Sequence, residues 1–184
     1  MKKVERKDIV DYVTWTKRRP EERPAILEAK KPRRIHVSDE LTFLFENADT
    51  MRYQIQEMMR VEQIVEEAAI LHELETYNDV LGDDGELAAT LLIEIDSPEG
   101  REKRLKELMG LPERLYLRFD DDSRAYARFD ERQVGEERLS SVQYLKFDAK
   151  GLVPVAVGAD HPALTAEKEL GPAQREALAA DLGA

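Results

Sequence analysis

The sequence contains no cysteine and no long hydrophobic run. The lack of cysteine excludes disulfides, thiolate metal sites, cysteine-ligated iron–sulfur clusters and a cysteine nucleophile. No window approaches the roughly 18 apolar residues of a transmembrane helix. The opening letters, MKKVERKDIVDYV, contain no continuous apolar stretch of the kind that a secretory signal needs. We therefore expect a cytoplasmic protein without a membrane span.

Short catalytic motifs are also missing. The sequence has no GxxxxGK[ST] phosphate loop, no GxGxxG, no GxSxG and no HExxH. Function therefore has to be argued from less specific patterns.

Charge is abundant and unevenly distributed. Of the 184 residues 36% are charged, and the net charge is −11, yet residues 1–36 hold 12 Lys/Arg against 6 Asp/Glu. A length of this size suits one domain, residues 1–184, in which residues 1–34 form a basic N-terminal arm or helical segment. This segment could bind nucleic acid or an acidic partner, or it could pack back on the acidic remainder of its own chain. The carboxylates that interrupt it weaken the nucleic-acid interpretation.

The stretch 34–81 contains the strongest patterns. Alternating apolar residues over 35–45 predict a strand with a turn at Ser38–Asp39, and Asn47, Asp49 and Thr50 are candidate helix caps. From Thr50 to about Leu81 the pattern is helical, about 45 Å long if it is unbroken, with a break near Ala68–Ala69 as the alternative. Because its apolar residues cover several sides, this helix is expected to be central, buried by a sheet and by other helices or a second copy in a homodimer.

The remaining patterns complete an α+β fold. We expect an antiparallel sheet of about five or six strands packed against the long central helix, with helices at both ends of the chain. The further strands are predicted at 86–96, 115–119, 126–129, 138–147 and 152–157, the last at a sheet edge because of Pro154. The further helices are predicted from Pro20 to before Pro32, from Pro98 to Met109, from Pro162 to Leu170 with Asp160 as its cap, and from Pro172 to about Leu182.

Three histidines are the candidates for chemistry. His72 and Glu75 lie three residues apart on one helix face, the spacing by which helix bundles supply metal ligands. A metal site would form if His36 and His161 joined them, with Glu75 or Asp160 as carboxylate. Such a set suits iron, zinc or manganese. In the structural alternative, His72 bonds Glu75 or a carbonyl, His36 lies on the solvent side of an edge strand, and His161 donates to a capping carboxylate.

Long phrases of the sequence resemble a known family. They are HVSDELTFLFENADTMRYQIQEMMRVEQI, EEAAILHELETYNDVL, GELAATLLIEI, SSVQYLKF and ADHPALTAEKEL. Across nearly the whole chain the sequence is similar to the bacterial domain-of-unknown-function family 3501. Genes of this family often lie beside those for rubrerythrin-like and iron–sulfur reductase proteins, and this implies an accessory role in electron transfer or oxidative-stress defence. The resemblance implies no catalytic residues.

The preferred hypothesis is therefore an accessory or binding protein with a redox partner. A metal-binding protein or metalloenzyme using His72 and Glu75 with His36 or His161 is the alternative. A nucleic-acid-binding module using the basic N-terminal segment is the second alternative.

Overall fold

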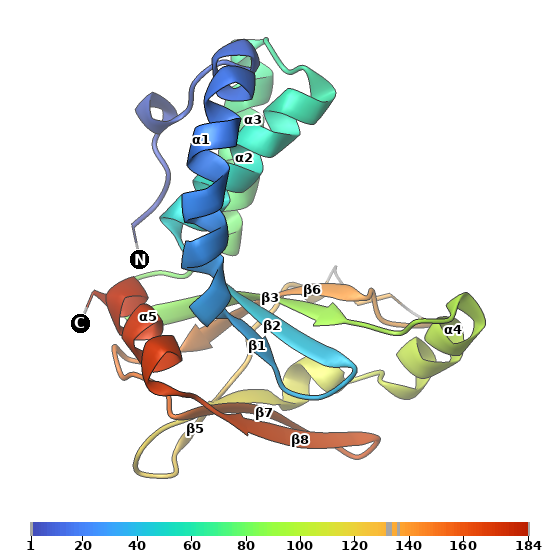
Figure 1. Cartoon of the computed structure of the whole chain (residues 1–184). Helices are drawn as coiled ribbons and strands as arrows, with labels where there is room; N and C mark the ends of the chain where they lie inside the picture. The colour runs from blue at the N-terminus through green and yellow to red at the C-terminus, as the bar shows by residue number, and fades with distance from the viewer. Residues whose placement is uncertain (1, 132–133, 136, 184) are drawn as a thin grey trace.

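Two four-stranded antiparallel sheets lie face to face and carry a bundle of three helices on the outer face of one of them (Figure 1). The computed structural model describes residues 2–131, 134–135 and 137–183. Sheet A has the order β1-β2-β3-β6, with β1 Arg34–His36, β2 Leu41–Glu46, β3 Glu86–Ile93 and β6 Val142–Asp148. Sheet B has the order β5-β4-β7-β8, with β5 Arg124–Tyr126, β4 Leu115–Arg118, β7 Ala156–His161 and β8 Leu164–Glu169.

The helices are α1 Tyr12–Lys30, α2 Ala48–Glu62, α3 Glu67–Val80, α4 Pro98–Glu107 and α5 Pro172–Leu182. Short 3-10 turns are η1 Arg6–Asp8, η2 Lys31–Arg33 and η3 Leu111–Arg114. We refer to α1, α2 and α3 as the three-helix bundle and to the two sheets with α4 and α5 as the two-sheet body. No helix within residues 2–131, 134–135 and 137–183 combines the length and the hydrophobicity that a membrane span requires.

The main core lies between the sheets because alternate residues of each strand point inward. Phe43 is paired with Ile35 on one side and with Leu91 on the other, and all three are buried. Leu117 and Val157 of sheet B are paired with each other and belong to the same buried cluster. Burying side chains of this size contributes about 1.5–3 kcal/mol each, so this layer holds the body together.

The three-helix bundle has its own apolar contacts. Helix α2 begins at a capping box formed by Asn47 and Thr50, and it ends at Gln63, whose φ of 54° is left-handed. Helix α3 then returns toward the sheets, and Ile55, Met59 and Ile70 are buried between the elements. Trp15 of α1 packs edge-on against Tyr53 of α2, with ring centroids 5.8 Å apart. The bundle is therefore stabilised independently of the core between the sheets.

A buried ion pair fastens the bundle to the body. Arg33 donates from Nε and Nη2 to the carboxylate of Asp181 on α5, at 2.7 and 2.8 Å, and the two side chains are 11% and 4% exposed. Asn47 donates to the same carboxylate at 2.8 Å. This contact connects the end of α1, the start of α2 and the last helix of the chain.

A buried carboxyl group lies at the same junction. Glu46 accepts hydrogen bonds from Thr50 Oγ1 at 2.5 Å and from Thr90 Oγ1 at 3.2 Å. Burial raises the pKa of Glu46 and the charge of Asp181 raises it further, while the two hydroxyls and the charge of Lys30 lower it, with a net rise. The root of the bundle therefore contains both a salt bridge and a carboxyl group that is costly to ionise.

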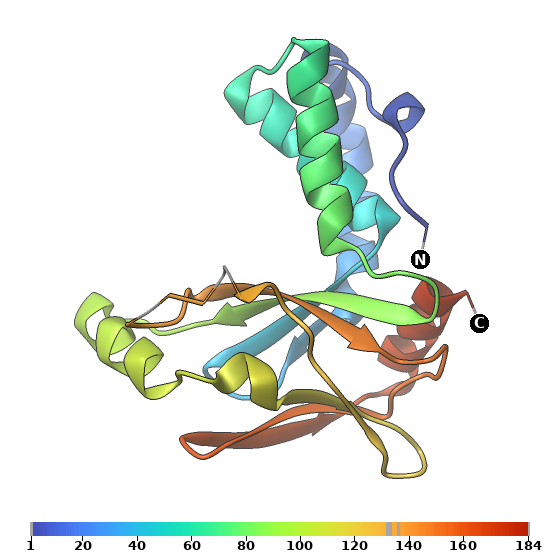
Figure 2. The ribbon, with the colours of Figure 1, turned by 180° about the vertical axis from the view of Figure 1, so that it is seen from behind.

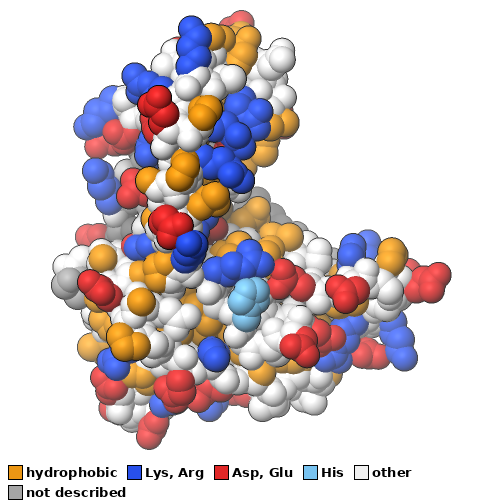
Figure 3. All heavy atoms as spheres, viewed as in Figure 1, with side chains coloured by type: hydrophobic (Ala, Val, Ile, Leu, Met, Phe, Trp, Pro, Cys, Tyr) orange, Lys and Arg blue, Asp and Glu red, His pale blue; other side chains and the backbone are white. Residues whose placement is uncertain are grey.

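The basic N-terminal segment packs on its own chain. Arg6, Arg19 and Arg33 form ion pairs with Glu67, Glu57 and Asp181, which belong to α3, α2 and α5. On the face shown in Figure 3, basic and acidic side chains are interspersed over the bundle and the body. These contacts agree with the interpretation in which the basic segment packs on the acidic remainder of its own chain.

Several expectations are confirmed. The strand pair at 34–46 with its turn and the strand at 86–93 are present. Strands β4 and β5 form the expected hairpin, but its second arm is Arg124–Tyr126 rather than 126–129. Helix α4 begins after Ser97, whose hydroxyl accepts from Gly100 N, and α5 follows Gly171–Pro172 as expected. The α+β class is therefore correct.

The predicted arrangement of one sheet against one long helix is wrong. The strands divide into two sheets, and the helical pattern of residues 50–81 is broken at Gln63 rather than at Ala68–Ala69. Its several apolar sides are explained by contacts with α1 and with the N-terminal residues Val4 and Ile9.

The helix predicted at 162–170 is also wrong. These residues form the turn and second strand of the β7–β8 hairpin, in which His161 is paired with Leu164. Helix-favouring residues there are overridden by strand pairing. The edge strand predicted at 152–157 is also wrong: β7 begins only at Ala156 and lies inside sheet B, between β4 and β8. Pro154 precedes β7 and therefore removes none of its hydrogen bonds. Helix α1 likewise begins earlier than predicted and runs through Pro20 and Pro24.

Candidate functional site

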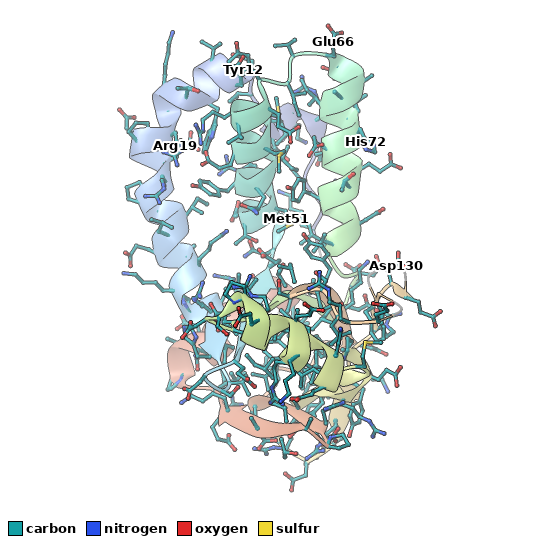
Figure 4. All side chains as sticks on the ribbon, turned by 90° about the vertical axis from the view of Figure 1, so that its right-hand side faces the viewer. Tyr12, Arg19, Met51, Glu66, His72 and Asp130 are labelled. Atoms are coloured by element: carbon teal, nitrogen blue, oxygen red, sulfur yellow. The ribbon has the colours of Figure 1, made fainter. Side chains whose placement is uncertain are left out.

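The predicted metal ligands lie on three different elements. His72 and Glu75 are exposed on α3, and Figure 4 places His72 well above the sheets. His36 is on β1 of sheet A, and Asp160 and His161 are on β7 of sheet B. Among the described residues no three His, Asp or Glu side chains are placed to hold a metal ion. The structure therefore does not bring the three histidines together.

His161 has a structural environment. Ala163 N donates to Nδ1 at 3.1 Å, so Nε2 carries the ring proton and donates it to Met109 O at 3.0 Å. Both ring nitrogens are used, and the contact ties the β7–β8 turn to the segment before η3. Asp160 caps no helix; its Oδ2 accepts from Tyr126 OH at 2.7 Å and from Arg124 Nη1 at 3.0 Å.

His36 lies on the solvent side of the edge strand β1, as the structural alternative predicts. Its Nδ1 is 2.8 Å from Thr42 Oγ1, and the Thr42 hydroxyl donates to Glu94. Nδ1 therefore donates to Thr42, and Nε2 accepts from Arg34 Nε at 3.3 Å. Arg34 also contacts Glu94, at 3.2 Å, which closes a ring of four polar side chains.

A cleft between the bundle and the body is the better candidate site. It has a volume of about 700 Å³, within the range of about 300–1,000 Å³ that is usual for ligand sites. Figure 2 shows α3 descending onto sheet A beside β6. We call this site the bundle–sheet cleft. Its lining comes from the second half of α3, from Asp83 and the start of β3, from residues 128–130 and from β6: Glu73, Thr76, Tyr77, Asp79, Val80, Asp83, Glu86, Arg128, Phe129, Asp130, Tyr144 and Lys146.

Main-chain pairing explains why these segments meet. Strand β6 is paired with β3, and Arg128 exchanges two backbone hydrogen bonds of 2.8 Å with Lys146, so residues 128–130 follow the outer edge of β6. Lys3 Nζ donates to the carbonyls of Asn78 and Leu81, at 2.9 and 2.7 Å, and ties the N-terminal segment to the end of α3. Figure 4 places Asp130 just below the lower end of α3.

Aromatic rings form part of the cleft wall. Tyr77 is half-buried, Phe129 is partly buried and Tyr144 is 43% exposed. Burial raises the pKa of Tyr77, and the nearby Glu73 and Tyr144 raise it further. The Tyr77 hydroxyl therefore remains protonated and able to donate a hydrogen bond.

The charges of the cleft are mainly negative. Five of its lining residues are Asp or Glu, and two are Lys or Arg. Arg128 is engaged by Glu86 in an ion pair. Helix α3 ends here without a basic residue in its own last turn, and the ammonium of Lys3 compensates the negative end of its dipole instead.

The lining residues that the structure describes include no nucleophile with an adjacent base. They do include aromatic rings, carboxylates and a lysine, which are groups that recognise a ligand or a partner. Sequence reasoning missed Phe129 and Tyr144. The available signal was Tyr144 at an outward position of an alternating strand, where a large aromatic residue is left unburied by its own sheet.

Comparisons with known proteins give a family and a fold. The family model described as "Protein of unknown function (DUF3501)" matches residues 3–182. A crystal structure of a novel protein of unknown function from Burkholderia pseudomallei K96243 is similar, with a TM-score of 0.88 and 32% identity, and the match covers 98% of this chain and 100% of that one. None of the curated proteins matches the chain.

Proposed function

This chain belongs to the DUF3501 family of proteins of unknown function, and from its candidate site we propose that it is an accessory protein that binds a partner through the bundle–sheet cleft. The observation that supports this most directly is the cleft itself. It is a concave surface of about 700 Å³ that combines three aromatic rings with charged side chains. Aromatic residues are enriched at protein interfaces, where they bury a large area at a small cost in conformational entropy.

We further propose that the partner is a redox protein, of the iron–sulfur or rubrerythrin-like kind that the sequence resemblance implies. The role would then be in electron transfer or oxidative-stress defence. Transient redox complexes bury less than about 1,200 Å² in total, so such a partner needs only a small docking surface. A chain without cysteine would contribute the docking surface, and the partner would contribute the redox centre.

The test is recovery of the partner from a native host with cleft variants. Thr76→Trp on α3 places a large ring inside the cleft, whereas Glu75→Trp adds the same ring at an exposed position of the same helix outside the cleft. The unaltered chain and Glu75→Trp are expected to recover an iron–sulfur or rubrerythrin-like protein, and Thr76→Trp is expected to lose it.

Two other results would contradict the proposal. If the unaltered chain recovers no redox protein, the proposal that the partner is a redox protein is refuted. Equal recovery by Thr76→Trp and Glu75→Trp would show that the cleft is not the binding surface.

A further inference from the structure

We propose that the bundle–sheet cleft recognises a cationic side chain, an arginine or lysine that a partner presents on an extended segment. This rests on the proposed function, because it names the chemistry that the partner inserts into the same cleft.

The carboxylates on the α3 side are not neutralised by ion pairs. Glu73, Asp79 and Asp83 form no salt bridge with any residue in the described part of the chain. Glu86 differs, since Arg128 already pairs with it. The ammonium of Lys3 lies at the end of α3 near Asp79 and Asp83 and offsets part of this charge, but the five carboxylates of the cleft outnumber Lys3, Arg128 and Lys146, so the cleft attracts a cation and repels an anion.

The aromatic rings supply the second half of the recognition. Tyr77 and Tyr144 lie close enough for Tyr144 to contribute to the raised pKa of Tyr77, and they come from opposite walls, α3 and β6. A guanidinium or ammonium group over a tyrosine face gains about 0.5–1 kcal/mol at exposed sites and more when water is excluded. Carboxylates beside aromatic faces are the arrangement that selects an organic cation over a strongly hydrated metal ion.

The cations of the cleft do not compete for this position. Arg128 is paired with Glu86, and Lys3 donates to the carbonyls at the end of α3, where Asp79 and Asp83 are near its ammonium; no described basic residue forms a salt bridge with Glu73. Lys146 remains on the β6 side, and its charge contributes to the lowered pKa of Lys3, which burial lowers most. The partner's basic side chain therefore enters beside Glu73 and Tyr77, away from Lys3, and a carbonyl or carboxylate next to it in the partner segment meets Lys146.

The size of the cleft agrees with an extended segment. A volume of about 700 Å³ exceeds that of one side chain and leaves room for adjoining main chain. Recognition of one anchoring side chain with flanking backbone is a common mode for short linear segments.

The test is a titration of the full chain followed by backbone amide NMR. The probes are the peptide acetyl-Gly-Arg-Gly-Arg-Gly-amide, the same peptide with lysine and the same peptide with glutamate. We expect the arginine and lysine peptides to bind with millimolar dissociation constants and to shift the amides of residues around Tyr77 and Tyr144. The glutamate peptide is expected to leave these signals unchanged.

Matched double variants separate local charge from net charge. Glu73→Gln with Asp79→Asn removes two cleft carboxylates, and Glu66→Gln with Glu75→Gln removes two exposed ones on or next to the same helix outside the cleft. The first pair is expected to weaken the arginine peptide at least fivefold, and the second less than twofold. Equal effects of the two pairs, or equal binding of the glutamate peptide, would overturn the proposal.

The partner-recovery experiment keeps this inference distinct from the proposed function. If Thr76→Trp abolishes recovery while Glu73→Gln with Asp79→Asn leaves it intact, the cleft binds its partner without a cation and only this inference fails. If Thr76→Trp has no effect, the proposed function itself fails.

Discussion

Glu57 is the electrostatic centre of the three-helix bundle, and its replacement gives the most quantitative prediction. Trp15 Nε1 donates to Glu57 Oε1 at 2.8 Å, Arg19 Nε donates to both oxygens at 2.8 and 3.0 Å, and Arg60 donates at 3.4 Å. Burial alone would raise the pKa of Glu57, but these hydrogen bonds outweigh it and lower the pKa from 4.5 to about 2. The Glu57 side chain is only 18% exposed, so solvent screens these interactions weakly.

The magnitude follows from the pKa. A fall from 4.5 to about 2 corresponds to about 3 kcal/mol of stabilisation of the folded state by the charged carboxylate. Because the pKa is lower in the folded chain, this stabilisation is complete above about pH 4.5 and is lost as the pH falls through about 2. Glu57→Gln should therefore lower the free energy of unfolding by about 3 kcal/mol at pH 7, or the melting temperature by about 6–12 °C.

Urea unfolding at 25 °C, followed by fluorescence of the single tryptophan, measures this effect. Trp15 is 1% exposed and touches the site directly, so it reports on the bundle. The difference between the unaltered chain and Glu57→Gln should narrow as the pH is lowered from 5 to 3, because protonated Glu57 resembles glutamine. Glu62→Gln, an exposed change on the same helix, should stay within about 0.5 kcal/mol. A Glu57→Gln effect no larger than that of Glu62→Gln, or one independent of pH, would refute the reasoning.

Three further predictions concern the root of the bundle and the metal hypothesis. Asp181→Asn should cost about 3–5 kcal/mol in urea unfolding, because Arg33 stays buried without its counter-charge, whereas Asp120→Asn, which breaks an exposed pair with another residue of α5, should cost less than about 1 kcal/mol. Glu46→Gln should be more stable than the unaltered chain at pH 8, and the gap should close toward pH 4.5, because the raised pKa of Glu46 means that its charge is unfavourable in the folded state; a constant gap would contradict this. Protein purified without chelator or histidine tag should contain substoichiometric transition metal by elemental analysis, unchanged by His72→Ala, and a stoichiometric metal lost in that variant would restore the metal hypothesis.

Local signals predicted the elements well where the sequence marks both their pattern and their ends. The strand pair at 34–46 has period-two alternation and a Ser–Asp turn, and α4 has a serine cap followed by proline. The break between α2 and α3 carries no glycine or proline. Gln63 adopts the left-handed conformation there, and a glutamine in the sequence does not indicate that a helix will end at it.

Long-range choices could not be predicted. The division of the strands into two sheets depends on the pairing of β6 with β3, whose paired residues are 50 to 62 positions apart. It also depends on the β7–β8 hairpin, which forms from residues that locally favour a helix. The metal hypothesis depended on the same kind of long-range arrangement. The sequence positions of three histidines on helices and strands do not show whether their side chains meet in the fold, and the described residues contain no group of ligands placed to hold a metal ion. The bundle–sheet cleft was also not predicted from the sequence, because its walls come from segments that are far apart in the chain: α3, β3, β6 and residues 128–130.

The salt bridge between Arg33 and Asp181 also places a constraint on synthesis of the chain. The two residues are 148 positions apart. At a synthesis rate of about 5–20 residues per second, Asp181 is therefore added to the chain about 7–30 seconds after Arg33. During that interval the helices of the bundle have their own apolar contacts, while the surface that will dock on the body is incomplete. The bundle is therefore expected to form first and to lack its buried ion pair with the body until α5 is released, which makes this interval the time at which the nascent chain is most open to chaperones.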